Sequence, residues 1–193
     1  MKQYFLAILS IVIICTTACT DYNQVLKTQD YEYKYEAAKA CYAEGYYNRA
    51  ATLLQDVLSV LKGTDQGEES LYLAGLSNMK AHNYEAASTI FKKYYQTYPR
   101  GKYVEEARFN CGKSLYQLTP EPKLDQTDTF NAVTEFQNFI ELFPGSKLRP
   151  AAQDMIFKLQ DKLVEKEYLS AKLYYDLGAY IGNGANLTNA IIP

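Results

Sequence analysis

The 193-residue sequence contains no tryptophan and only one histidine, His82. No second histidine or cysteine stands at ligand spacing from His82, so the pattern offers no zinc site. A Gly-rich phosphate loop, a G-x-S-x-G motif and a Cys/His pair suited to nucleophilic catalysis are also missing. We therefore expect no metal, no cofactor and no enzyme activity, and we interpret the scattered carboxylates as solvated surface charge.

The sequence also has little excess charge and little cysteine. Its formal net charge is −2, which gives no field to attract nucleic acid. After the apolar run at residues 5–15, no second run is long enough to cross a membrane. Cys41 and Cys111 fall in separate predicted repeats, so we interpret them as buried small apolar residues. A disulfide between them, which an oxidising compartment would permit, is the alternative.

The first nineteen residues have the pattern of an export signal. Lys2 supplies the positive start, an apolar run covers residues 5–15, and small residues precede Cys19. The run is too short to span a bilayer as a stable helix. This end resembles a bacterial lipoprotein signal, in which Cys19 becomes the first mature residue and carries acyl chains such as palmitate. The alternatives are an uncleaved anchor and an ordinary signal peptide.

A repeat runs through the rest of the chain. Residues 47–50 (Tyr-Asn-Arg-Ala) recur 37 residues later as residues 84–87 (Tyr-Glu-Ala-Ala), and Gly75 recurs 37 residues later as Gly112. A third copy follows at a spacing of 45, which relates Pro99 to Pro144. The extra residues of this copy include the prolines of the 119–123 segment, so they predict a loop between its two helices. Periods of this size indicate stacked helical repeats.

Each copy has the apolar spacing of two antiparallel helices. Gly75 and Ala87 are small where the two helices would cross, Tyr84 and Phe91 fill the space beside them, and Pro99 ends the second helix. These five residues match the tetratricopeptide repeat at its usual relative spacing. In the first copy Ala38 replaces the glycine and Lys62 replaces the proline. Since one helix pair cannot bury its apolar faces alone, neighbouring pairs must stack.

We therefore predict an all-α fold, a tetratricopeptide-repeat α-solenoid preceded by a lipoprotein signal peptide. The expected segments are a signal peptide at residues 1–18, a polar tether at 19–30 and repeats at 31–64, 68–101, 105–146 and 150–193. In the last repeat we expect one helix at about 150–166 and another at about 167–178. The chain then becomes rich in Gly and Asn, so an incomplete or truncated C-terminal end is expected.

Nearly the whole mature chain resembles the BamD family of outer-membrane assembly lipoproteins, and it departs from the family at the C-terminus. The resemblance rests on the Cys19 leader, the opening helix at 31–38, the 84–99 and 136–146 segments, and the 161–168 and 171–175 segments. The high tyrosine content and the turn at 143–146 resemble versions from Bacteroidota. The resemblance implies a lipid-anchored scaffold on the periplasmic face of the outer membrane that catalyses no chemistry. It implies docking on the POTRA domains of a BamA-like barrel protein, which the C-terminal end of family members helps to hold, and reception of unfolded barrel proteins.

A peptide-binding groove is expected along the first helices of the repeats, which line the inner wall of such a stack. In this register each copy offers aromatic or apolar residues with a lysine beside them. The candidates are Tyr35, Lys39 and Tyr42, then Tyr72, Met79 and Lys80, then Phe109, Lys113 and Tyr116. The rings would contact the aromatic-rich terminal strand signal of barrel proteins, and the lysines would attract its carboxylate. Packing between repeats is the competing interpretation for these rings.

Two other functions fit a lipid-anchored repeat protein. One is coordination of the cell envelope, in the manner of the Tol-Pal system. The other is glycan binding by a nutrient-uptake lipoprotein, although such chains are usually longer and rich in tryptophan. Co-purification with a POTRA-bearing barrel protein would favour the assembly function over both.

Overall fold

The computed structural model describes residues 22–182, with side chains to Gly178, and in this range it contains helices and no strand. The predicted leader, Cys19 and the C-terminal segment after residue 182 lie outside the described residues. The helices are α2 (Tyr31–Ala43), α3 (Tyr47–Val57), α4 (Asp65–Lys80), α5 (Tyr84–Thr97), α6 (Val104–Leu118), α7 (Thr127–Leu142) and α8 (Arg149–Gly182). They form two compact units that divide between Ala107 and Arg108. Among the helices of residues 22–182, none combines the length with the hydropathy that a membrane-spanning segment needs.

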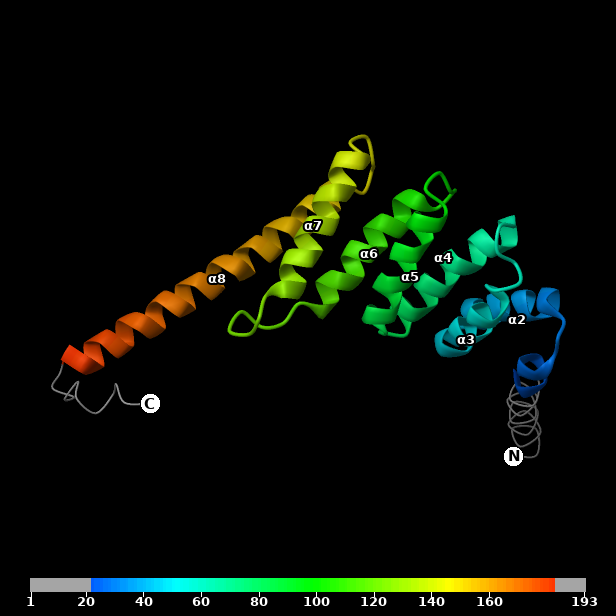
Figure 1. Cartoon of the computed structure of the whole chain (residues 1–193), viewed down its shortest axis with the longest axis horizontal. Helices are drawn as coiled ribbons and strands as arrows, with labels where there is room; N and C mark the ends of the chain where they lie inside the picture. Colours follow the sequence, from blue (N-terminus) through cyan, green and yellow to red (C-terminus); the bar gives the residue numbers. More distant parts are fainter. Residues whose placement is uncertain (1–21, 183–193) are drawn as a thin grey trace, which may run out of the picture. The chain divides into compact units, whose positions relative to one another are not determined.

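In the first unit, α2 packs on α3, α3 on α4 and α4 on α5, so that neighbouring helices pack as predicted (Figure 1). Helix starts are fixed by side-chain caps: the Asp30 carboxylate accepts from Tyr33 N at 3.0 Å, and Thr64 Oγ1 accepts from Gly67 N at 3.0 Å. The two turns within pairs use left-handed residues 37 positions apart, Gly45 with φ 86° and His82 with φ 62°. The sequence repeat is therefore also a repeat of backbone conformation.

The small residues of the repeat lie where the helices cross, as the sequence predicted. A Cβ built on Gly75 would lie 2.6 Å from the ring of Phe91, and one built on Gly112 would lie 2.9 Å from the ring of Phe136. Both rings are fully buried. In the first pair, Ala38 and Leu54 occupy the corresponding positions, and both are also fully buried. The contact between Gly75 and Phe91, with its counterpart between Gly112 and Phe136, is called the Gly–Phe crossing below.

Replacing Gly75 with alanine should destabilise the protein, although alanine is the better helix former. The added methyl group would overlap a buried ring that cannot swing away, and overpacking of this kind costs about 1–3 kcal/mol. The gain in helix propensity returns at most about 1 kcal/mol. Gly178→Ala is the matched control, because nothing lies within 4 Å of its Cβ position. Urea unfolding followed by circular dichroism should show a lower midpoint for Gly75→Ala only; equal midpoints would contradict the crossing.

In the second unit, α7 packs on α8 around a core of aromatic and aliphatic side chains. The predicted insertion is the loop between the end of α6 at Leu118 and the start of α7 at Thr127. Two lysines of α8 bind this loop: Lys162 Nζ donates to Thr119 Oγ1 at 2.6 Å, and Lys166 Nζ donates to the Leu124 carbonyl at 2.9 Å. The two lysine side chains thus fix the position of this proline-containing loop against α8.

The last helix corrects one expectation. Instead of two helices at 150–166 and 167–178, the chain forms the single helix α8, which runs back along α7 and extends past the start of α7 (Figure 1). No proline or glycine stands between Pro150 and Gly178, so nothing in the sequence ends the helix near residue 166. Pro150 lies in the first turn, where a missing N–H leaves no helical hydrogen bond unmade. Large apolar side chains from the middle of α8 onward are exposed: Val164, Tyr168, Leu173, Tyr174, Tyr175 and Leu177.

The N-terminal segment also differs from the polar tether predicted at 19–30. Residues 22–27 are helical, and Val25, 4% exposed, belongs to the core cluster that includes Ala38, Leu53 and Leu54. Tyr22 and Leu26 pack against the same cluster. These three apolar side chains dock an otherwise polar segment, because packing them against α2 and α3 removes their apolar surface from water.

Candidate functional site

The candidate first-helix residues of α2 lie close together but mostly serve packing. Tyr35 is 3% exposed, with Lys39 Nζ 4.8 Å from its ring centroid. Burial raises the pKa of the Tyr35 phenol, with a further contribution from Glu69. Lys39 pairs with Glu36 at 3.4 Å and with Glu69 at 4.0 Å, so its charge is already shared by two carboxylates. Tyr42 is half-buried and meets Tyr47 edge-on at 5.5 Å.

Tyr72 belongs to a cluster of tyrosines in the first unit. Its ring stacks on that of Tyr103 with centroids 4.4 Å apart and planes 2° from parallel, and it lies 5.8 Å from Tyr94. Buried Tyr94 donates to Glu68 Oε1 at 2.5 Å and accepts from Tyr103 N at 2.9 Å. Burial, with the Glu68 hydrogen bond, raises the pKa of Tyr94 far above its usual range. These contacts join α4, α5 and the start of α6, so much of the Tyr72 surface is engaged within the fold.

The remaining candidates differ in exposure. At the end of α4, Met79 is half-buried and Lys80 is exposed. In the second unit, Phe109 is 9% exposed and packs in the core against Phe136 and Phe139, whose centroids lie 5.9 and 5.6 Å from its own. Lys113 and Tyr116 are half-buried on α6, and Tyr116 packs against the same core. Packing inside the fold, the competing interpretation, therefore accounts for the positions of Tyr35 and Phe109.

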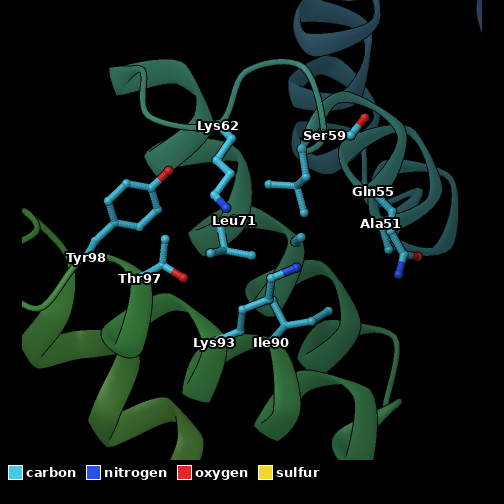
Figure 2. Close-up of a pocket in the computed structure, with 11 residues that line it drawn as sticks. Ala51, Gln55, Ser59, Lys62, Leu71, Ile90, Lys93, Thr97 and Tyr98 are labelled. Atoms are coloured by element: carbon cyan, nitrogen blue, oxygen red, sulfur yellow. The ribbon is translucent and has the colours of Figure 1, made fainter.

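The first unit contains a pocket that the sequence does not predict. It has a volume of about 310 Å³ and lies between α3, α4 and α5 (Figure 2). Its apolar floor includes Leu71, Ala74 and Ile90. Figure 2 shows Lys62 reaching from the α3–α4 loop, and Lys93 from α5, toward the region above Leu71. Tyr98 closes one side, and its hydroxyl accepts from Gly63 N at 3.4 Å.

The pocket combines an apolar surface with two cationic groups, and we call it the two-lysine pocket. Lys62 and Lys93 are exposed, and neither forms an ion pair with another residue in the range 22–182. Ammonium groups beside an apolar floor suit an aliphatic or aromatic group that carries a carboxylate. The one sequence feature that marks this pocket is Lys62, which stands where the later repeats carry Pro99 and Pro144.

The described part of the chain offers few groups for metal binding or thiol chemistry. Across residues 22–182, no three His, Cys, Asp or Glu side chains gather in a way that could hold a metal ion. The structure forms no disulfide between Cys41, which is half-buried, and Cys111, which is buried, so the predicted burial is confirmed for Cys111 and is only partial for Cys41. Burial raises the pKa of the Cys41 thiol, with a smaller contribution from the Glu44 carboxylate, and this lowers its fraction of reactive thiolate at neutral pH.

Comparisons with known proteins agree with the fold. A family model described as YfiO, outer membrane lipoprotein, matches residues 27–188. A putative outer membrane protein assembly factor BamD from Aquifex aeolicus (strain VF5) is 26% identical over 175 residues, which cover 90% of this chain and 57% of that protein. The outer membrane protein assembly factor BamD of Pasteurella multocida (strain Pm70) is 22% identical over 179 residues, covering 86% of this chain and 67% of that one.

The chain thus spans little more than half the length of one of these relatives and about two thirds of the other. Among solved structures, one described as MamA AMB-1 superimposes with a TM-score of 0.56 at 17% identity, covering 93% of both chains. At that identity the likeness concerns the fold alone, and it supports the tetratricopeptide-like arrangement of helix pairs.

Proposed function

The chain belongs to the YfiO/BamD family of outer membrane lipoproteins, and from this membership we propose that it is a non-catalytic scaffold for the assembly of outer-membrane β-barrel proteins. In this proposal lipid on Cys19 anchors it to the periplasmic face of the outer membrane. It docks on the POTRA domains of a BamA-like barrel protein and receives unfolded barrel proteins for folding and insertion. The observation that carries the proposal is the family match across residues 27–188, a range that contains every helix pair.

Docking on the BamA-like protein is assigned to α8 from Val164 onward. The exposed apolar side chains there, from Val164 to Leu177, form a surface that a partner domain can cover. Tyr174 and Tyr175 are 75% and 76% exposed, and tyrosine is among the residues that contribute most to the cores of protein interfaces. The family resemblance points to the same end of the chain.

Reception of unfolded barrel proteins is assigned to the two-lysine pocket. The terminal strand signal of a barrel protein offers an aromatic side chain and a carboxylate, which match the apolar floor and the ammonium groups of Lys62 and Lys93. The first-helix face is a second proposed contact, through its more exposed members Met79 and Lys80. Tyr35 and Phe109 would support either surface from inside the fold.

Reversing both pocket charges should weaken the binding of a barrel-signal peptide. For Lys62→Glu with Lys93→Glu, we expect a dissociation constant at least about tenfold higher, which corresponds to about 1.4 kcal/mol. The measurement is fluorescence anisotropy with a labelled terminal-strand peptide that ends in a free carboxylate. An amidated peptide should bind the unmodified protein with a similar loss.

Lys92→Glu is the matched control for this experiment. Lys92 is exposed on α5 beside Lys93 but does not line the pocket, so its reversal changes the net charge and leaves the site intact. Unchanged affinity in the double variant, or an equal loss per charge in Lys92→Glu, would show that client binding does not use the pocket.

A further inference from the structure

The segment that follows the predicted lipid-modified cysteine is fixed to the first helix pair. Val25 is buried against α2 and α3, and Thr28 N donates to the Gln24 carbonyl at 3.1 Å, which closes the short helix. Asp30 then caps α2 directly. From Tyr22 onward the chain is therefore part of the folded body.

Only Thr20 and Asp21 separate Cys19 from Tyr22. Three Cα–Cα steps of 3.8 Å span at most about 11 Å, whatever their conformation. The headgroup region on each side of the hydrocarbon core is itself roughly 6 Å thick. If acyl chains on Cys19 enter the bilayer, as the proposed function has it, the surface around Tyr22 must lie at the membrane interface.

The side chains around Tyr22 suit that position. The Arg49 guanidinium lies between two rings, 5.0 Å from the centroid of Tyr22 and 4.9 Å from that of Tyr46. Tyr46 is 45% exposed, and Tyr33, 47% exposed, lines the same hollow of about 380 Å³ along α2 and α3. Tyrosine rings favour the headgroup level of a bilayer, and a guanidinium pairs with lipid phosphate.

The charges of this surface do not make it strongly basic. Glu36 and Glu44 line the same hollow as Arg49, and Glu36 pairs with Lys39. Contact with a bilayer would therefore depend on the rings and on the covalent anchor more than on attraction to anionic lipid.

We propose that Tyr22, Tyr46 and Arg49 form a membrane-contacting edge of the α2–α3 pair, held against the lipid headgroups by the short link to Cys19. This inference rests on the lipid anchor of the proposed function. It replaces a free tether with a fixed attachment, so that α2 and α3 are the helices next to the bilayer.

The absence of tryptophan from the sequence makes the test direct. Tyr46→Trp introduces a single fluorophore before α3, and Val60→Trp introduces one beyond the end of α3 at a position 51% exposed. The full mature lipoprotein is placed in vesicles of phosphatidylethanolamine and phosphatidylglycerol that carry bromine on the acyl chains near the headgroup. Since α3 is about 16 Å long, we expect Tyr46→Trp emission to be quenched roughly twofold more than Val60→Trp emission.

Flotation of the vesicles distinguishes the lipid anchor on Cys19 from the membrane-contacting edge. Protein that floats but shows equal quenching at both positions would overturn the membrane-contacting edge and leave the anchor standing. Protein that does not float would overturn the anchor, and the edge with it. Raising the salt concentration should leave the quenching difference unchanged, and its loss at high salt would contradict a contact made by the rings.

Discussion

Phe136→Ala should remove about 3–5 kcal/mol of stability, which is a large part of the total for a small folded unit. The Phe136 ring is fully buried between Gly112, whose Cβ position it would contact at 2.9 Å, and Phe109, whose ring meets it at 5.9 Å. Removing the ring leaves a cavity at the crossing of α6 and α7. These helices cannot move together to fill it, because other core side chains hold them apart. Phe91, 45 residues earlier, is the counterpart of Phe136 in the preceding repeat. The loss of stability in Phe136→Ala therefore tests a contact that the repeat pattern predicts in both copies.

Phe157→Ala is the control for this substitution. Phe157 lies on α8 in the same unit and is 58% exposed, so its removal should change stability by less than about 1 kcal/mol. Urea unfolding followed by circular dichroism measures both. A midpoint for Phe136→Ala close to that of Phe157→Ala would mean that α6 and α7 do not cross through this ring.

Cys19→Ser should release the protein from the outer membrane. Each buried methylene contributes about 0.8 kcal/mol, and several acyl chains are needed for stable attachment, so if Cys19 carries the proposed lipid, its loss removes almost all membrane affinity. Cell fractionation followed by immunoblotting should move the protein from the membrane to the soluble fraction. The intact mass of the membrane-bound wild type should exceed that of a mature chain starting at Cys19 by the mass of the acyl groups.

Cys15→Ser is the matched control, because Cys15 lies four residues upstream within the predicted leader. It should leave both the mass and the membrane attachment unchanged. Membrane retention of Cys19→Ser as a mature chain without the leader or added acyl mass would contradict lipid attachment at this residue, and equal release by both variants would point to a general defect in export.

The fold could be predicted from the sequence because the repeated residues are the ones that determine how the two helices of a pair pack. Gly75 and Gly112 stand 37 residues apart, each opposite a phenylalanine, and only a small residue permits that approach of two helices. The proline-containing insertion before α7 was predictable for the same reason, since proline cannot continue a helix. Where the sequence lacks such a signal, as between residues 151 and 177, the division into two helices was wrong.

The candidate binding residues were harder to predict. In stacked helix pairs, both faces of a first helix can be covered by neighbours, so helical spacing does not separate an open ring from a packed one. Tyr35 and Phe109 have the register of groove residues and are nevertheless buried. The sequence does not predict the two-lysine pocket, because its residues come from α3, α4 and α5 and the loop between α3 and α4, and only the packed structure brings Lys62 and Lys93 to the same apolar floor. Docking of residues 22–27 depends on Val25, Tyr22 and Leu26, three apolar residues that form no repeat signal in the sequence.

Association with a POTRA-bearing barrel protein is the central claim, and site-specific photocrosslinking in intact cells tests it most directly. A photoreactive residue replaces Tyr174, 75% exposed on α8, and a control replaces the exposed Asn131 on α7. The account predicts that the Tyr174 position yields a crosslinked BamA-like protein, identified by mass spectrometry, and that the Asn131 position yields much less. Recovery of Tol-Pal components or of a glycan-uptake receptor from the Tyr174 position, with no barrel protein bearing POTRA domains, would contradict it.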